Sequence, residues 1–401
     1  MSDGRSVYIA GAGIAGLTLA LALAKFGVRV TVLERQRSVQ EIGAGLQISP
    51  NARRVLDRLG LDRALTAASF EPEGIDVYSF RAARPLVTMQ LGAAARERYG
   101  AAYAVIHRAD LADALYKATR RFANIDIAFD VINFEVEPGP RGVTVTYGQA
   151  GGETRQGRAF AFIGADGINS TTRTRLLAGP QPQWTGRLAW RVLLDIAELP
   201  QLRPDHTSVL LGADFHIVCY PLPHRGKINV VLFTRDSAGD RAAPAPPASA
   251  LGHPRIAAIL KAGEGRWSFW PVGAVQTEAW HKGPIGLLGD AAHAMMPFQA
   301  QGAAMAIEDA AILAPLLVTE PSAEAAFAGY ESLRRPRVEQ VAALSRANGR
   351  AFHMRFPASL ARDAVIRMQG PQGHFRRLDW LYSYDPAPEA EASIATATRQ
   401  V

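Results

Sequence analysis

The chain has 401 residues, of which 48% are hydrophobic and 20% charged, a composition typical of a globular protein long enough for two closely packed domains. Its net charge is +7, but the basic residues form no dense run, which argues against a nucleic-acid surface. A single cysteine, Cys219, excludes an internal disulfide framework and a cysteine-rich metal site, and the nine histidines show no metal-ligand spacing.

The first predicted elements are a strand, a helix and a second strand. Short apolar runs predict strands at Ser6–Ala10 and Val28–Leu33, and the apolar segment Ile14–Phe26 between them predicts a helix that Gly27 ends. The three glycines that follow Ala10, and the absence of a clear cleavage site, argue against a signal peptide. This N-terminal segment therefore predicts a β-α-β unit of about 30 residues.

Glycines and an acidic residue stand where a dinucleotide-binding β-α-β unit needs them. In the run Gly11-Ala12-Gly13-Ile14-Ala15-Gly16, Gly11 permits a tight turn and Gly13 lets the backbone approach a pyrophosphate. Gly16 allows the helix to pack closely on the strand, and Glu34 can accept hydrogen bonds from an adenosine ribose. The alternative is a structural glycine loop, and the motif alone does not distinguish FAD from NAD.

The next elements are predicted from apolar spacing and turn residues. Helices are expected at 49–59 and 109–122, and strands at 125–134, 143–147 and 160–164. The last strand leads into Gly164-Ala165-Asp166-Gly167. This segment is either a second nucleotide-binding loop or a β-turn in which Asp-Gly supplies left-handed geometry.

The middle of the chain is rich in β-like segments, and the C-terminal part is helical. Strands are predicted at 188–196, 208–211, 216–222, 228–234 and 267–275, which together favour an antiparallel sheet. From residue 324 the tail is predicted to be helical through 330–348, with an aromatic cluster at 380–385 and a frayed end at 386–401. No segment approaches the ~20 apolar residues that span a bilayer, so we expect a cytoplasmic protein.

Between these parts lies Ile285–Gly302, which reads IGLLGDAAHAMMPFQAQG. An apolar strand ends in Gly289-Asp290, a loop with Pro297 follows, and a helix is predicted to begin near Gly302. A carboxylate at a strand end and a helix N-terminus can hold a polyhydroxylated, partly anionic ligand. We expect His293 to brace this loop and not to take part in chemistry.

The three motifs, in this order and spacing, resemble those of single-component FAD-dependent aromatic hydroxylases, the family of salicylate, 3-hydroxybenzoate and 6-hydroxynicotinate hydroxylases. The resemblance runs over essentially the whole chain. It implies an α/β fold in which a Rossmann-like FAD-binding domain (1–75, 100–178 and 278–325) is interwoven with an antiparallel-sheet substrate domain (76–99 and 179–277). A C-terminal helical segment at 326–401 completes the predicted fold.

The same resemblance assigns cofactor contacts residue by residue. Asp290 matches the acid that binds the ribityl chain, and Asp166 matches the acid of the DG motif. In the segment Gly43–Gln47 the glycines suit a backbone that passes close to the flavin ring, although Gln47 stands where some relatives have His. Ala294 departs from the usual Pro. The remaining matched positions are Ala15, Arg35, Arg108, Val131, Pro297, Gly302 and Ala303.

The substrate site is predicted on the sheet of the second domain. His216 and Tyr220 lie four residues apart on one strand, so both side chains point to one face, and their spacing resembles a His/Tyr pair near the substrate phenol in relatives. We expect His216 as the base and Tyr220 as its relay; a buried pair satisfied by backbone partners is the alternative. Arg191 and Gln299 are weaker candidates to anchor a carboxylate or amide.

The resemblance implies a monooxygenase that hydroxylates a small phenolic or N-heteroaromatic acid through a C4a-hydroperoxyflavin. FAD would be the cofactor, with NADH or NADPH and O2 as co-substrates; no metal, nucleic acid or membrane partner is expected, and a homodimer is common in such families. Other flavin chemistry (an oxidase, a halogenase or a polyketide hydroxylase) and a non-catalytic flavin-binding regulatory protein are the alternatives. The substrate, the ring position and any decarboxylation stay open.

Overall fold

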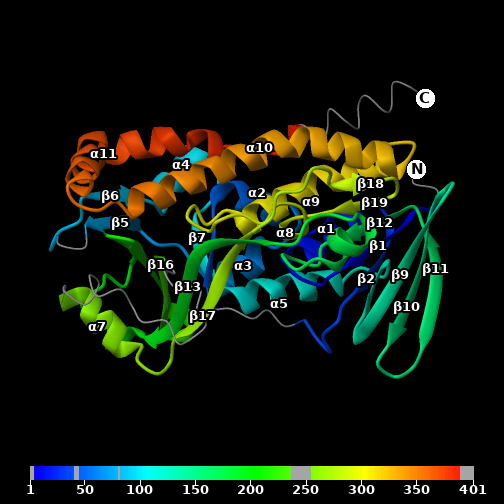
Figure 1. Ribbon diagram of the computed structural model, residues 1–401, viewed down its shortest axis with the longest axis horizontal. Helices are drawn as coiled ribbons and strands as arrows, with labels where there is room; N and C mark the ends of the chain where they lie inside the picture. The colour runs from blue at the N-terminus through cyan, green and yellow to red at the C-terminus, as the bar shows by residue number, and fades with distance from the viewer. Residues whose placement is uncertain (1–3, 40–44, 80–81, 236–253, 389–401) are drawn as a thin grey trace.

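The computed structural model describes residues 4–39, 45–79, 82–235 and 254–388 (Figure 1). Two large sheets, two small ones and a C-terminal layer of long helices make up the molecule. The chain passes repeatedly between the two large sheets, as the mixed α/β prediction requires. The predicted domain limits stay a prediction, and the predicted frayed end from 389 onward lies outside the described residues.

The first large sheet carries the β-α-β unit. It has six strands in the order β18-β19-β12-β1-β2-β8, and all neighbours are parallel except β18 and β19. Its core is apolar because parallel strands are covered on both faces. Helix α1 (Ile14–Lys25) packs against α5 (Arg108–Thr119) and α9 (Gly302–Thr319). The strands are β1 (Ser6–Ala10), β2 (Arg29–Leu33), β8 (Ile125–Ala128), β12 (Ala161–Gly164), β18 (His281–Lys282) and β19 (Ile285–Leu287).

The second large sheet has seven strands in the order β17-β13-β16-β15-β14-β5-β6. Its neighbours are antiparallel except β14 and β5, which run parallel, a pairing that the sequence did not suggest. One face, with Trp190, Ile217 and Cys219, packs on helix α7 (Pro254–Ala262). The strands are β5 (Gly74–Ser79), β6 (Val87–Gln90), β13 (Gln183–Asp195), β14 (His206–Gly212), β15 (Phe215–Leu222), β16 (Lys227–Arg235) and β17 (Ser268–Ala274).

The single strand predicted at 125–134 is wrong, because the chain turns at Asp130, where φ is +58°. Residues 125–128 form β8, whereas β9 (Val131–Gly139) pairs with β10 (Gly142–Gln149), which pairs with β11 (Thr154–Ala159), in a separate antiparallel sheet. A further small sheet joins β3 (Gly45–Ile48), β7 (Ala104–His107) and β4 (Ser69–Phe70). Shorter helices are α2 (Pro50–Arg58), α3 (Asp62–Ala68), α4 (Ala93–Tyr99), α8 (Asp290–His293) and the π-helical turn Thr172–Leu176.

Two long helices close the chain along one side of the molecule (Figure 1). Helix α10 spans Ala323–Phe352, as the sequence predicts, and α11 (Ala358–Tyr382) consists of two helices that meet at Gly370, where φ is +56°. The sequence predicts a helical segment from 326 onward but not the break in α11, where Gly370-Pro371 interrupts the helix. Helix α9 is long and apolar enough to cross a membrane by length and composition, but 72% of it is buried, as in the core helix of a globular protein.

Candidate functional site

A deep pocket opens at one edge of the six-stranded sheet, where β1, β2, β12 and β19 all end. Ligands of open α/β sheets bind outside the carboxyl ends of the strands, so this is the expected place for a cofactor. The cavity has a volume of about 930 Å³. Twelve of the predicted site residues line it: Gly11, Gly13, Ala15, Glu34, Arg35, Arg108, Val131, Asp166, Arg191, Asp290, Gly302 and Ala303.

The glycine loop at the base of the pocket has no room for side chains. A Cβ on Gly11 would lie 2.5 Å from the carbonyl oxygen of Ala165, and φ of +103° at Gly11 also disfavours any other residue. A Cβ on Gly16 would lie 2.0 Å from the carbonyl oxygen of Gly11. Gly16 therefore does not line the pocket but lets α1 approach β1, as the sequence pattern predicts.

The three predicted acids, Glu34, Asp166 and Asp290, differ in the hydrogen bonds that their carboxylates accept. Glu34 accepts hydrogen bonds from the backbone N–H groups of Ala12 and Gln36, both at 2.8 Å, which fixes its carboxylate beside the glycine loop. Asp166 is bound by its own turn, because it accepts from the Ser170 hydroxyl and from both the backbone and the side chain of Thr172.

Asp290 is instead exposed at the pocket wall. Its carboxylate has no hydrogen-bond partner within the described part of the chain. This carboxylate is therefore available to accept hydrogen bonds from a ligand.

Buried side chains hold the loop that carries Asp290. His293 Nε2 lies 2.6 Å from Asp309 Oδ2, and the backbone N–H of Gly289 donates to the same carboxylate at 3.2 Å. Arg334 donates from Nε to Asp309 at 2.8 Å, and its Nη1 lies 2.7 Å from Glu308 Oε2 without the alignment of a hydrogen bond. His293 thus braces the loop, as expected, through a network that the sequence did not reveal.

A second buried arginine joins this loop to the Asp166 turn. Arg173 is fully buried and donates to the carbonyl oxygens of Ile168, Pro180 and Ala291. It therefore ties the two predicted cofactor loops together, one after β12 and one after β19.

Arg191 stands where the pocket meets the seven-stranded sheet. Its guanidinium lies over the ring of Trp270, 5.2 Å from the centroid, and both residues line the pocket. Its Nε is buried without a hydrogen-bond partner, and no carboxylate pairs with it among the described residues. Burial lowers the pKa of Arg191. A half-buried cation with no carboxylate beside it is suited to bind an anionic ligand.

The predicted pair, His216 and Tyr220, lies on the same face of the seven-stranded sheet as Arg191, near the two ends of β15. Four residues of an antiparallel strand span about 14 Å, so a small ring between them would touch each from opposite sides. Neither side chain lines the pocket. Tyr220 packs on Gly45, where a Cβ would lie 2.5 Å from its ring. Gly45 therefore makes room for Tyr220, whereas Gly43 and Ala44 lie outside the described residues.

Two polar side chains that the sequence did not single out, those of Tyr103 and Asn348, hold the predicted site residues Gln47 and Gln299. Gln47, which the sequence assigned to the cofactor, accepts from the Tyr103 hydroxyl. Gln299 accepts from Asn348, and Tyr382 packs edge-on against Tyr103. Tyr103 directly precedes β7, whereas Asn348 lies on α10 and Tyr382 on α11. The sequence placed Tyr382 in the aromatic cluster 380–385, but no local motif marks Tyr103 or Asn348. Pro297 and Gln299 likewise do not line the cofactor pocket.

His216 is only 1% exposed and lies among aromatic rings. It stacks on Phe233 and meets Phe298 and Phe352 edge-on. Its Nδ1 lies 2.7 Å from Nε2 of His353, a residue at the end of α10 that the sequence did not indicate. Burial above all, and then the nearby His353 and Arg187, hold the pKa of His216 well below its usual range.

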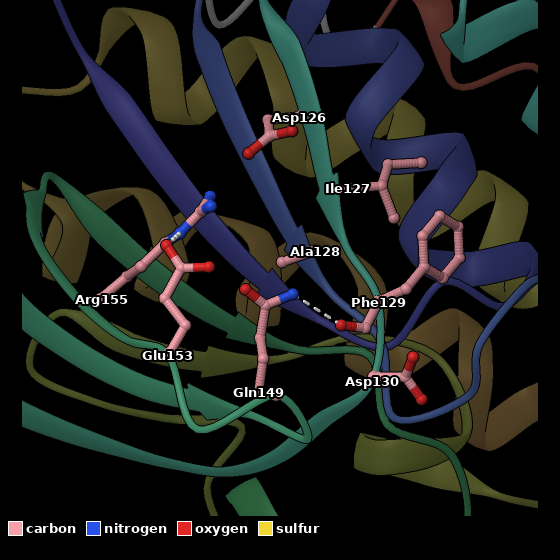
Figure 2. A pocket seen from close by; sticks show the side chains of 9 residues that line it. Asp126, Ile127, Ala128, Phe129, Asp130, Gln149, Glu153 and Arg155 are labelled. Atoms are coloured by element: carbon pink, nitrogen blue, oxygen red, sulfur yellow. Dashed lines mark hydrogen bonds and ion pairs between the residues drawn. The ribbon is translucent and has the colours of Figure 1, made fainter.

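A second hollow, of about 510 Å³, lies outside the edge strand β8 (Figure 2). Figure 2 shows Asp126, Asp130 and Glu153 around it, with Arg155 paired to Glu153. No predicted site residue lines it, and an acidic lining would repel a pyrophosphate. The pocket at the strand ends is therefore the candidate cofactor site.

Other chemistry finds little support in the part of the chain that the structure describes. No group of three or more His, Cys, Asp or Glu side chains there could hold a metal ion. Cys219 is buried, and burial raises the pKa of its thiol to about 12, as expected for a core thiol.

Comparisons with known proteins agree with this site. Residues 5–345 match the family described as "FAD binding domain". The chain is 34% identical to a 3-amino-4-hydroxybenzoate 2-monooxygenase of Streptomyces platensis (95% of this chain, 96% of the relative). It is 31% identical to a 3-hydroxybenzoate 6-hydroxylase of Klebsiella oxytoca (94% and 96%). The fold matches Klebsiella pneumoniae HpxO, solved with FAD and uric acid, with a TM-score of 0.81 at 22% identity over 94% of this chain and 97% of that one.

Proposed function

The chain belongs to the FAD binding domain family of single-component aromatic hydroxylases, and from this premise we propose that it is an FAD- and NAD(P)H-dependent monooxygenase of a small aromatic acid. The proposal of an acid rests on Arg191, a half-buried cation at the edge of the cofactor pocket that has no anionic partner among the described residues. The relatives act on aminohydroxybenzoate and hydroxybenzoate, which are compounds of this kind.

The residues of the pocket fit FAD. The N-termini of α1 and α9, at Gly13 and Gly302, supply backbone N–H groups and the positive ends of two helix dipoles for the pyrophosphate and the flavin ring. Glu34 would accept from the adenosine ribose and Asp290 from the ribityl chain. Gly13, which lines the pocket, would let the backbone approach the pyrophosphate closely.

When bound, FAD would supply the transfer of one atom of O2 to the ring, with NAD(P)H as electron donor. The overall reaction balances as aromatic C–H plus O2, NAD(P)H and a proton giving aromatic C–OH, water and NAD(P)⁺. The protein would orient the ring and keep water out. Arg191 would bind the carboxylate, and His216 and Tyr220 would contact polar groups at either end of the sheet face.

The choice of NADH or NADPH, a cytoplasmic location and a homodimer remain predictions. An oxidase or a non-catalytic flavoprotein are the rival functions. The test is to reconstitute the purified chain with FAD and to follow NADH and NADPH oxidation over a panel of hydroxybenzoates, aminohydroxybenzoates and hydroxynicotinates. Oxidation of NADH or NADPH that an aromatic compound stimulates, with a hydroxylated product, supports the proposal. Oxidation that yields only H2O2 with every compound contradicts it.

A further inference from the structure

Three side chains from distant parts of the chain form one hydrogen-bonded row. Arg187 on β13 contacts His353 through Nη1 and Nδ1, and His353 Nε2 lies 2.7 Å from His216 Nδ1. Arg187 and Arg191 share one face of β13, so the row begins four residues from the cation of the cofactor pocket. Both ring nitrogens of His353 and Nδ1 of His216 are engaged in this row, so the contacts fix hydrogen-bond roles as well as packing.

Arg187 determines which ring nitrogens of His353 and His216 carry a proton. A guanidinium has only donors and stays protonated, so His353 Nδ1 must accept. In a neutral imidazole the second nitrogen then carries the proton, and His353 Nε2–H donates to His216 Nδ1. His216 Nδ1 must therefore be an acceptor, which leaves the proton of His216 on Nε2.

Both imidazoles are held neutral by their surroundings. Burial, followed by Arg187, Arg235 and Arg362, lowers the pKa of His353 to about 3. The backbone N–H of Asp214 donates to the carbonyl oxygen of His353, but its carboxylate is engaged by Arg235 and Arg355. No second proton can therefore enter the row near neutral pH and relieve the constraint.

We infer that Arg187 and His353 are positioning residues that lock His216 in its Nε2–H tautomer, so that His216 presents a hydrogen-bond donor and not a base. This inference rests on the proposed function in so far as His216 faces the substrate. It revises the base role that the sequence suggested. The site would then take a substrate with an acceptor oxygen at that position, either an ionised phenol or a ring carbonyl.

The tautomer of His216 can be measured without catalytic turnover. In the FAD-reconstituted protein with ¹⁵N-labelled histidine, long-range ¹H–¹⁵N spectra at pH 7 distinguish Nδ1–H from Nε2–H for each ring. The signals of His216 and His353 are assigned by their loss in His216→Asn and His353→Phe. The lock predicts that both rings are purely Nε2–H. A His216 ring that carries its proton on Nδ1, or on both nitrogens, would overturn it.

Variants test the cause. Arg187→Met removes the donor that contacts His353 Nδ1, so an Nδ1–H form of His216 should become detectable. Arg187→Lys, which can also only donate, should retain the wild-type spectrum. Arg235→Met is the matched control, since it removes a nearby charge without touching the row. His353→Phe should release His216 as Arg187→Met does, and it serves if Arg187→Met fails to fold.

The outcomes separate this inference from the proposed function. If His216 stays purely Nε2–H in both Arg187→Met and His353→Phe, the row does not set its tautomer and the inference fails. If the lock behaves as described but no compound of the panel is hydroxylated, the proposed function fails while the lock stands. If hydroxylation occurs in a protein whose His216 carries its proton on Nδ1, the proposed function stands and the tautomer lock fails.

Discussion

Asp309→Asn tests whether the buried network positions the loop of Asp290. Asp309 is completely buried and accepts from His293, Arg334 and the backbone N–H of Gly289. Asparagine keeps the shape but loses the charge and one acceptor. Removing one partner of a buried ion pair costs roughly 3–5 kcal/mol. Because Glu308 remains 2.7 Å from Arg334, we expect the lower end, about 3 kcal/mol.

The pH dependence of the free energy of unfolding provides a second test of the same network. Burial raises the pKa of Asp309, but His293 and Arg334 outweigh it and lower the value from 3.8 to about 2. A carboxyl group whose pKa is lowered by folding stabilises the folded state at pH values above its unfolded pKa. This stabilisation is lost as the pH falls toward 2. The linkage amounts to about 2 kcal/mol between pH 4 and pH 2, and Asp309→Asn should lack it.

The assay is urea unfolding of the FAD-free and FAD-loaded protein, together with FAD titration. Asp309→Asn should also weaken FAD binding about tenfold, since a shift of the loop that costs 1.4 kcal/mol has that effect. Glu153→Gln, which breaks an exposed pair with Arg155, is the matched control and should change neither quantity. Wild-type unfolding and wild-type FAD affinity in Asp309→Asn would refute the reasoning.

The other predictions concern the site itself. Arg191→Met should raise the KM for a carboxylate substrate about 10- to 100-fold, the worth of a charge-assisted hydrogen bond, without changing FAD affinity; an unchanged KM would remove Arg191 from substrate binding. Asp290→Ala should weaken FAD binding at least about tenfold in a fluorescence titration, and equal affinity would contradict its assignment. Gly45→Ala should displace the Tyr220 ring, 2.5 Å from the new Cβ, and lower kcat/KM with FAD retained, whereas wild-type turnover would show that the ring moves aside at little cost.

The cofactor half of the site was predictable because its residues follow strand ends. Gly11, Glu34, Asp166 and Asp290 each stand at the carboxyl end of a strand, and parallel strands bring such positions to one edge. Order along the chain was therefore enough to place them in one pocket.

The substrate half was not predictable in the same way. Tyr103 precedes β7, Tyr382 lies on α11 and His353 directly follows α10. Only tertiary packing brings Tyr103 against Tyr382 and His353 against His216. Period-2 alternation correctly put His216 and Tyr220 on one face, about 14 Å apart along the strand, but did not reveal that neither side chain lines the cofactor pocket. The hydrogen-bond partners of His216, which decide its chemistry, left no trace in the local sequence.

The central claim is that this pocket holds FAD and directs one oxygen atom to an aromatic acid. It is tested most directly by mass analysis of the product formed under ¹⁸O2 with NAD(P)H and the best substrate of the panel. The expected product contains one ¹⁸O atom for each nicotinamide oxidised. A protein that binds no FAD, or one that oxidises NAD(P)H without placing ¹⁸O in any aromatic product, would contradict it.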